Sequence, residues 1–457
     1  MKITRFRGSG VNGYLDFDLQ FNDDLTFLTG INGTGKTSAL NSIVSLLLPR
    51  LDYLAGDFFE TISIEIDQDD KLVQLSATKH GPSTRIDCSL YPDDSLLLNE
   101  FEAPDTLPLH RHREIEAEYY KEFLLRNAKH PVVEFLEGLP TPMFLGLDRR
   151  SLSPDFETRR YARAPLHSQQ KRRSIFARSL GQSLDESLWF AQEKYQSYLR
   201  QEARLDGKFR ENLVVALIDF PPISFGGLLE DPSKDELMNI EKARKNLKRL
   251  PELLNVPTEL ISKNVDPMFE FLDKSLAVIR KPRSKSETDE HKFDARMEAL
   301  IDWSYNKTQL DKINRLSDIV SEYNDASAEV FGKANEFLDT VNTFLADSGK
   351  TVRFDGFGRL KFFIYSEEED RDIRTLSSGE IQLIVILTHL YFNPEVEKAN
   401  VFIIDEPELS LHVQWQEKFV DSIVKASSET QFILATHSPS IILDRVLNCV
   451  EISSKKP

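Results

Sequence analysis

Short apolar runs and alternating apolar positions at both ends of the chain predict β-strands in those regions. These strands are expected at residues 2–6, 15–21, 25–29, 59–66, 72–78, 351–354, 360–365, 401–404 and 432–435. Helical spacing is found at residues 38–48, 378–390 and 413–425. Because strands alternate with helices, the two ends are expected to build a parallel sheet that is covered by helices.

The middle of the chain has a different, largely helical pattern. Apolar residues return every three or four positions from 310 to 345, a continuous stripe that is typical of an amphipathic helix. The stripe spans too few heptads for a long rod, so packing within a helical subdomain is favoured over a coiled-coil seam. The sequence therefore predicts an α/β head built from residues 1–148 and 346–457, interrupted by a helical insertion at 149–345.

Composition narrows the class of protein without identifying it. The chain has 457 residues, enough for two or three structural units, and two cysteines that form no ligand-like pair. A disulfide framework and a zinc site are therefore not expected, and a reducing compartment fits. The longest apolar runs, 43–48 and 381–392, are shorter than the ~20 residues that cross a bilayer. Because the N-terminus has no hydrophobic signal region, a cytoplasmic protein without membrane contact is expected.

The charge pattern leaves nucleic acid open as a partner. The formal net charge of −17 argues against a surface that is basic throughout, but DNA binding depends on local patches. Residues 149–178 and 242–249 are two basic stretches within this acidic chain. Basic runs are more often solvated surface, so DNA contact is the less favoured interpretation of both stretches.

Residues 30–37 have the sequence Gly-Ile-Asn-Gly-Thr-Gly-Lys-Thr, which fits every fixed position of a phosphate-binding loop. A predicted strand precedes the loop and a predicted helix follows it, as such a loop requires. Glycines allow successive backbone N–H groups to point at a phosphate, while the lysine reaches the β- and γ-phosphates and the threonine hydroxyl binds Mg²⁺. The candidate nucleotide contacts are Asn32, Gly33, Gly35, Lys36, Thr37 and Ser38.

A second candidate segment is the apolar strand at 401–404, which ends in Asp405 and Glu406. A buried strand can place Asp405 beside the phosphate loop, where its carboxylate would hold the magnesium shell together with Thr37. Glu406 would then orient and polarise the attacking water. A strand that simply ends in two acids is the alternative, but it does not explain the glycine loop.

Two further segments complete a set of four motifs. Leu-Ser-Ser-Gly-Glu at 376–380 begins a predicted helix, whose N-terminus can face a phosphate. The alternative is an ordinary serine cap with a downstream glutamate, which would be favoured if the segment stood alone. His437 follows the strand at 432–435, in a position to contact a γ-phosphate. The candidate nucleotide contacts of the helix start are Ser377, Ser378, Gly379 and Glu380.

The four motifs, in this order, resemble those of the ABC-type ATPases, which include SMC, RecF and OLD proteins. The resemblance covers residues 1–80 and 350–440 and implies an α/β head with a mixed or parallel sheet that binds ATP and Mg²⁺. It also implies a homo-oligomer through head-to-head dimers, in which the 376–380 segment contacts nucleotide on the partner's phosphate loop. The family's usual glutamine does not follow the apolar run at 142–147, and Asp148 is the substitute candidate on the magnesium side.

Within that class, the Glu-Pro-Glu-Leu-Ser-Leu-His segment at 406–412 and the chain length resemble the ATPases of bacterial anti-phage systems. PtuA of Septu systems, also found with retrons, is the first resemblance and AriA of PARIS systems is the second. The former implies a regulatory ATPase that controls a separate HNH nuclease of the PtuB type. The sequence has no HNH-like histidine cluster, and the segment after His437 is too short for a catalytic domain. A nuclease is therefore expected on another chain.

Two other functions are alternatives to this one. A DNA repair ATPase of the RecF or SMC kind would bind DNA directly, and the basic stretches are the feature that favours it. The nucleotide-binding subunit of a transporter is disfavoured, because the insertion at 149–345 is far larger than the helical subdomain of such a subunit.

Overall fold

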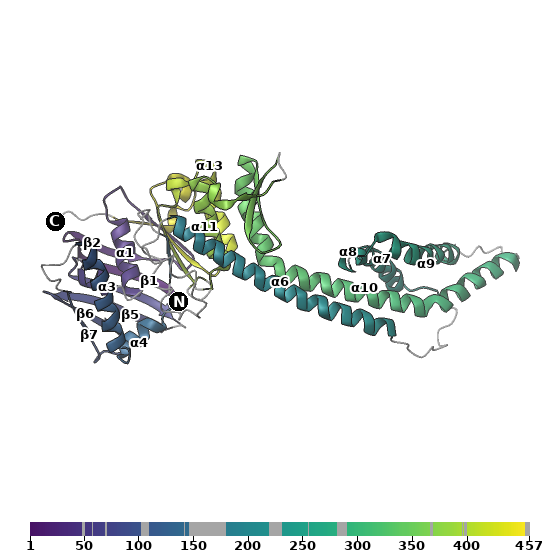
Figure 1. Cartoon of the computed structure of the whole chain (residues 1–457), viewed down its shortest axis with the longest axis horizontal. Helices are drawn as coiled ribbons and strands as arrows, with labels where there is room; N and C mark the ends of the chain where they lie inside the picture. The colour runs from purple at the N-terminus through teal and green to yellow at the C-terminus, as the bar shows by residue number, and fades with distance from the viewer. Residues whose placement is uncertain are drawn as a thin grey trace. The chain divides into compact units, whose positions relative to one another are not determined.

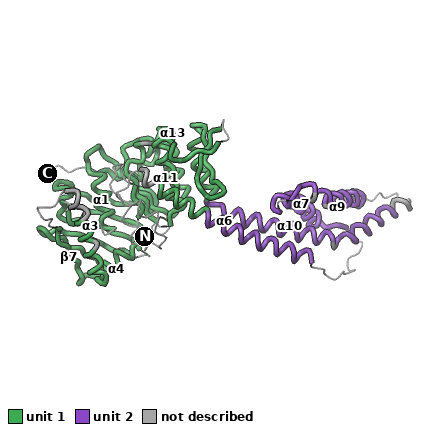
Figure 2. The backbone as a smooth tube through the Cα atoms, in the orientation of Figure 1, with its two compact units in different colours: residues 1–195, 334–457 green, residues 196–333 purple. Residues whose placement is uncertain are grey.

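The computed structural model describes residues 1–47, 51–56, 58–68, 71–101, 109–140, 142–145, 180–218, 231–254, 256–280, 290–365, 369–394, 396 and 400–452. The chain divides into two compact units (Figure 2). Unit 1 comprises Met1–Tyr195 and Ala334–Pro457, and unit 2 comprises Gln196–Lys333. Both chain ends therefore build one unit, which we call the head. Asp148 and the basic stretch at 149–178 lie outside the described residues.

A parallel sheet lies in the head. Its strand order is β14-β3-β13-β12-β8, and each neighbouring pair is parallel. The strands are β3 (Leu25–Thr29), β8 (Met143–Leu145), β12 (Val401–Asp405), β13 (Gln431–Ala435) and β14 (Cys449–Glu451). Every residue of β12 and β13 is buried, which explains why both strands are continuous apolar runs. The predicted α/β fold class is confirmed.

A second, antiparallel sheet is formed by the N-terminal part of the chain, with the order β2-β1-β4-β5-β6-β7. Its strands are β1 (Lys2–Val11), β2 (Leu15–Gln20), β4 (Thr61–Gln68), β5 (Lys71–His80), β6 (Ser83–Cys88) and β7 (Leu96–Asn99). Burial alternates strictly along β2, as expected for a strand with one face on the core. Helices α2 (Leu51–Gly56), α3 (Leu109–Arg126) and α4 (Pro131–Gly138) also belong to this part of the head.

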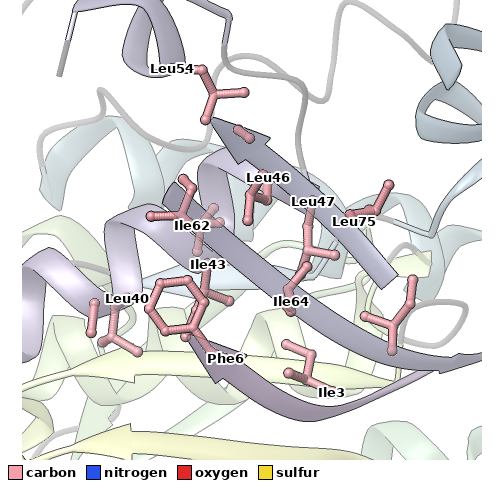
Figure 3. Packing of buried hydrophobic residues seen from close by; sticks show 14 of the residues in the cluster. Ile3, Phe6, Leu40, Ile43, Leu46, Leu47, Leu54, Ile62, Ile64 and Leu75 are labelled. Carbon is pink, nitrogen blue, oxygen red and sulfur yellow. The ribbon is translucent and has the colours of Figure 1, made fainter. Parts of the chain in front are cut away.

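Helix α1 (Lys36–Leu47) follows the glycine loop and contacts strands of both sheets. Its apolar face packs on the antiparallel sheet, where Leu40 and Ile43 lie near Phe6 and Ile64 (Figure 3). Ile403 of the parallel sheet belongs to the same core cluster. The helix that begins at the glycine loop is therefore fixed by a large apolar core, and this core fixes the position of the loop.

The C-terminal part of the head carries a small sheet and the remaining helices (Figure 1). The sheet has the order β11-β10-β9, with β9 (Lys350–Phe354), β10 (Leu360–Ile364) and β11 (Arg371–Asp372). The helices are α11 (Ser378–Phe392), α13 (Val413–Ala426) and α14 (Pro439–Ile442), with short 3-10 turns at Ala346–Ser348, Ile373–Thr375, Pro407–Ser410 and Val446–Asn448. Helix α11 is buried along most of its length, in agreement with its nearly unbroken apolar sequence.

Unit 2 is helical. Helices α6 (Leu180–Ile218) and α10 (Glu290–Leu345) have residues in both units, whereas α7 (Lys234–Leu247), α8 (Leu250–Leu254) and α9 (Thr258–Ile279) lie in unit 2 alone. Leu310 and Val320 of the apolar stripe share one core with residues of α7 and α9, so this stretch of the stripe packs within a helical subdomain. Phe209 of α6 contacts Tyr323 of α10, with ring centroids 4.7 Å apart. Among the described residues, no helix has the length and apolar content needed to span a membrane.

Candidate nucleotide site

The glycine loop connects the end of β3 to the start of α1, as the sequence predicts. Gly33 and Gly35 have φ angles of 89° and 95°, a region that L side chains rarely adopt. Lys36 is 5% exposed, and its Nζ donates hydrogen bonds to the carbonyl oxygens of Gly30 at 2.8 Å and Ile31 at 3.4 Å. The lysine ammonium is therefore held over the backbone of the loop. A bound phosphate would replace the two carbonyl oxygens as the hydrogen-bond acceptor of this ammonium.

The other predicted contacts of the loop lie around this ammonium. Asn32, Gly33 and Thr37 are exposed, so their polar groups are accessible to a ligand. Ser38 is half-buried, and its Oγ accepts a hydrogen bond from Asn12 Nδ2 at 3.0 Å. The structure thus adds Asn12, at the turn between β1 and β2, to the surroundings of the loop. The sequence pattern gave no signal for Asn12, because that contact arises only when the hairpin folds over the start of α1.

Gly35→Ala tests how closely the loop is packed. A Cβ at Gly35 would lie 2.7 Å from Leu15 Cδ1, whereas a Cβ at Gly33 would meet nothing within 4 Å. Both alanines share the left-handed strain of about 1–2 kcal/mol. We therefore expect Gly35→Ala to lower the free energy of unfolding by about 1–3 kcal/mol more than Gly33→Ala. Urea unfolding measures the difference, and equal losses would contradict the packing described for Gly35.

The phosphate loop and the end of β12 meet in the structure. Thr37 Oγ1 donates a hydrogen bond of 2.7 Å to Asp405 Oδ2, although the two residues are 368 positions apart in the sequence. Asp405 is 3% exposed, and its Oδ1 has no hydrogen-bond partner among the described residues. Burial raises the pKa of Asp405 to about 6, with a smaller contribution from the negative charge of Glu406, while the Thr37 hydrogen bond opposes the rise.

These residues fit a magnesium ion. Mg²⁺ prefers oxygen ligands and is usually bound through one or two carboxylates together with substrate phosphates. The hydroxyl of Thr37 and the unpartnered Oδ1 of Asp405 supply such oxygens side by side. The described residues contain no group of three or more His, Cys, Asp or Glu side chains that could hold a metal ion alone. An ion held here would therefore complete its shell with water and phosphate oxygens.

The raised pKa of Asp405 predicts a pH-dependent effect of Asp405→Asn on stability. In the folded protein the pKa is about 6, above the ordinary value of 3.8, so the contribution of this group to stability falls as the pH rises through that range. Without nucleotide and Mg²⁺, we expect Asp405→Asn to be more stable than the parent by about 1–3 kcal/mol near pH 8. Near pH 5 the difference should be clearly smaller, and it vanishes only below the ordinary pKa of 3.8, where the aspartic acid is protonated in both the folded and the unfolded protein. Thermal unfolding at both pH values checks this, and a difference that does not depend on pH would contradict it.

Glu406 directly follows β12 in a strained backbone conformation. Its φ and ψ angles are 50° and 61°, in the left-handed region, and its N–H donates to the carbonyl oxygen of Ala435 at 2.8 Å. Such strain in a non-glycine residue is found most often at functional sites. The side chain is half-buried and makes no hydrogen bond or ion pair with other described residues. Its carboxylate is therefore free to bind a water molecule beside the phosphate loop.

His437 lies at the end of β13, next to β12 in the parallel sheet. Glu408 holds it there: its Oε1 accepts hydrogen bonds from His437 N at 2.9 Å and from Thr436 Oγ1 at 2.7 Å. The same oxygen lies 3.1 Å from His437 Nδ1. Sequence reasoning assigned no role to Glu408. The one available signal was a second glutamate shortly after Asp405, and only the fold shows that it faces the histidine.

The 376–380 segment forms a capping box at the start of α11. The side chain of Ser377 accepts from the N–H of Glu380, and Glu380 accepts in return from Ser377 N at 2.9 Å. Lys350 Nζ donates to both oxygens of Glu380, at 2.8 and 3.0 Å. Burial raises the pKa of Glu380, but the hydrogen bonds of Lys350 and Ser377 outweigh it, so the pKa lies below its ordinary value.

This arrangement changes the interpretation of one predicted contact. Glu380 is 4% exposed and both its oxygens are engaged within the chain, so it stabilises the helix start rather than facing a ligand. Glu380 therefore belongs to an ordinary serine cap, which is the alternative interpretation of this segment. Ser377 and Ser378 are exposed at the helix N-terminus, where they are accessible to a nucleotide.

The basic stretch at 242–249 is partly neutralised. Lys242 Nζ pairs with Asp318 at 2.9 Å, and Arg244 makes two hydrogen bonds to Asp273. Lys245, Lys248 and Arg249 are exposed. The stretch thus offers fewer available charges than its sequence indicates.

A glycine loop at a helix start, with a buried carboxylate hydrogen-bonded to the first turn of that helix, is the arrangement of a P-loop nucleotide site. The chain belongs to the AAA_15 family, whose model, described as an AAA ATPase domain, matches residues 1–442. This match confirms the ATPase class predicted from the four motifs.

The chain is also similar to individual proteins. It is 26% identical over 158 residues to a protein named "Retron Vc95 probable ATPase" from Vibrio cholerae serotype O1 biovar El Tor. That match covers 32% of this chain and 30% of the relative, so it spans less than a third of either protein. Among solved structures, an Smc head domain from Pyrococcus furiosus is 14% identical with a TM-score of 0.35, covering 98% of this chain and 93% of that one. The SMC head domain from Thermotoga maritima is 10% identical with a TM-score of 0.33, covering 97% and 91%.

Proposed function

We propose that the chain hydrolyses ATP with Mg²⁺ in a site completed by a second copy of itself, and thereby controls a separate nuclease in anti-phage defence. The observation that carries the proposal is the hydrogen bond of 2.7 Å between Thr37 and Asp405. It places the phosphate loop beside a buried carboxylate, with the unengaged carboxylate of Glu406 one residue further on. Phosphoryl transfer depends on this combination of positioning and electrostatic stabilisation.

Each residue has a distinct part in the hydrolysis. The backbone N–H groups of the loop and the Lys36 ammonium would bind the β- and γ-phosphates. Thr37 and Asp405 would hold the magnesium ion, which lowers the barrier when bound by neutralising charge on the phosphates. Glu406 would orient the attacking water and accept its proton, and His437 would contact the γ-phosphate from the neighbouring strand end.

The second copy is inferred from the 376–380 segment. Ser377 and Ser378 are exposed at the N-terminus of a 15-residue helix, a position that favours a phosphate. Leu409 and Val413, which flank the loop after β12, are 49% and 55% exposed. A second copy that closes over the helix N-terminus is proposed to cover these two side chains. If the site is shared, ATPase activity per protomer should rise with protomer concentration, whereas a fully active monomer would refute the shared site.

Two observations support a role in defence: the similarity to the retron-associated ATPase, and the Glu-Pro-Glu-Leu-Ser-Leu-His segment at 406–412. The proposed partner is an HNH nuclease encoded next to this chain. Co-expression with the product of the adjacent open reading frame provides the test. We expect DNA cleavage only when both chains are present, and its level should change when Glu406→Gln replaces the parent. Cleavage that is indifferent to this variant would contradict nucleotide control.

Direct DNA binding is the alternative function. It is favoured by the exposed Lys245, Lys248 and Arg249 on and after α7. Salt-dependent DNA binding by the isolated chain, weakened by Lys245→Glu combined with Lys248→Glu, would support this alternative. Absence of DNA binding by the isolated chain, with cleavage when the nuclease is added, would support the regulatory function.

A further inference from the structure

Glu408 makes several buried contacts, although it is not among the predicted site residues. Its side chain is 6% exposed; Oε1 accepts hydrogen bonds from the Thr436 hydroxyl and the His437 N–H, and it lies 3.1 Å from His437 Nδ1. The other oxygen, Oε2, is buried without a hydrogen-bond partner among the described residues. A buried carboxylate with an unpartnered oxygen is costly for stability. A role in function would explain why a carboxylate occupies this position.

The contact to the ring determines which nitrogen of His437 can meet a ligand. A carboxylate accepts but does not donate, so the Glu408 oxygen 3.1 Å from Nδ1 favours the tautomer that carries the proton on Nδ1. The partner of one imidazole nitrogen sets the state of the other nitrogen. Nε2, at the far side of the ring, is therefore the nitrogen that remains for a phosphate. The side chain of His437 is 46% exposed, so it is accessible to a ligand.

Gln416 fixes the loop that carries Glu408. Its Nε2 donates to the carbonyl oxygens of Glu408 at 3.3 Å and Leu411 at 2.9 Å. Its Oε1 accepts from Ser438 Oγ at 2.7 Å. Gln416 is 8% exposed, so these bonds are shielded from water. The loop after β12 and the segment after β13 are therefore linked twice, by Glu408 at His437 and by Gln416 at Ser438.

We propose that Glu408 is a positioning residue for ATP hydrolysis, which fixes the His437 ring so that Nε2 faces the γ-phosphate. This inference rests on the proposed function, because it assumes that the phosphate lies at the loop of residues 30–37. Glu408 itself touches neither nucleotide nor water in this arrangement. Its effect on the reaction is transmitted through His437.

The experiment compares Glu408→Gln, His437→Ala and the double variant. Glutamine has the shape of glutamate but lacks its charge, so the backbone N–H and the Thr436 hydroxyl keep an acceptor. Partners that orient a metal-ligating histidine are worth about 10–100-fold in metal affinity or activity, and we expect the same range for the orientation of His437. We expect Glu408→Gln to lower kcat by this factor while KM for ATP stays within about threefold of the parent. Glu417→Gln, an exposed glutamate on α13, is the matched control and should leave kcat unchanged.

The double variant separates positioning from other roles. If Glu408 acts through His437, adding Glu408→Gln to His437→Ala should lower kcat by less than about twofold further. A second full decrease in the double variant, or an unchanged kcat in Glu408→Gln, would overturn the proposal. Thermal unfolding of each variant identifies any loss of fold, and Glu408→Asp then serves as a second variant whose kcat should lie between those of the parent and Glu408→Gln.

A spectroscopic measurement does not depend on activity. In protein with ¹⁵N-labelled histidine, the His437 ring should show the Nδ1–H tautomer in the parent and a changed ratio of tautomers in Glu408→Ala, which removes the acceptor. An unchanged ratio would contradict the contact. If the parent shows this tautomer but no ATP hydrolysis, the proposed function fails while the Glu408–His437 contact stands, so the two failures can be told apart.

Discussion

Lys36→Ala should weaken ATP binding by at least about a hundredfold and abolish hydrolysis, because hydrogen bonds to charged groups contribute about 1.5–3 kcal/mol each. The Lys36 ammonium lies over the glycine loop, 2.8 Å from the Gly30 carbonyl oxygen, and it is almost fully buried. A phosphate that enters the loop gains this charge in a site shielded from water, where the attraction exceeds that of an exposed lysine.

Equilibrium binding of a fluorescent ATP analogue measures the effect. Lys71→Ala, which removes an exposed lysine at the start of β5, is the matched control and should bind like the parent. If Lys36→Ala retained the parental dissociation constant, the loop would not be the nucleotide site. Thermal unfolding should show a folded protein for both variants, since the ammonium of Lys36 contacts backbone carbonyl oxygens and not the apolar core.

Glu406→Gln should have the opposite signature: ATP binds with parental affinity, but kcat falls by about 10²–10⁴-fold, the usual worth of a general base. Glutamine keeps the size of the side chain and can occupy the same left-handed backbone position, so the strain at φ 50° is preserved. Only the ability to accept a proton from water is lost. The phosphate contacts of Lys36 and Thr37 are unaffected, which is why binding should persist.

Phosphate release under saturating ATP gives kcat, and the binding assay above gives the affinity. Glu417→Gln is again the control for the loss of one exposed carboxylate. Hydrolysis by Glu406→Gln at the parental rate would show that another residue activates the water. Loss of ATP binding in this variant would show that Glu406 supports the nucleotide rather than the water.

The elements that build the nucleotide site could be predicted because each has a sequence that suits a single kind of surroundings. Strands β12 and β13 are buried on both faces, so they are uniformly apolar, and the glycine loop has few other structural uses. Other elements were missed for physical reasons. Strand β6 (Ser83–Cys88) is mostly polar, and α9 contains Pro267, which argues against a helix until the tertiary packing is known. Helix α10 begins at Glu290, well before its expected start, because the stripe is less regular there.

The sequence predicts the motifs of the site, but not the hydrogen bonds that connect them. The order of strands places the ends of β12 and β13 side by side, and this alone allows Glu408 to reach Thr436 and His437. A single sequence carries no record of such pairings. The opposite case is Glu380: its motif indicates a ligand contact, yet the capping box with Ser377 and the salt bridge to Lys350 engage both of its oxygens within the chain. In both cases the deciding fact is a partner that lies far away in the sequence.

A mixing experiment tests the central claim that two copies complete one ATPase site. Lys36→Ala removes the phosphate loop's lysine, and Ser378→Arg blocks the start of α11, so each variant alone should be inactive. In a mixed dimer, the intact loop of the Ser378→Arg chain meets the intact helix start of the Lys36→Ala chain. We therefore predict that mixing the two inactive variants restores ATP hydrolysis, in proportion to the mixed dimers formed. If the mixture stays inactive while both variants are folded and able to dimerise, or if Ser378→Arg alone hydrolyses ATP at the parental rate, the shared site is contradicted.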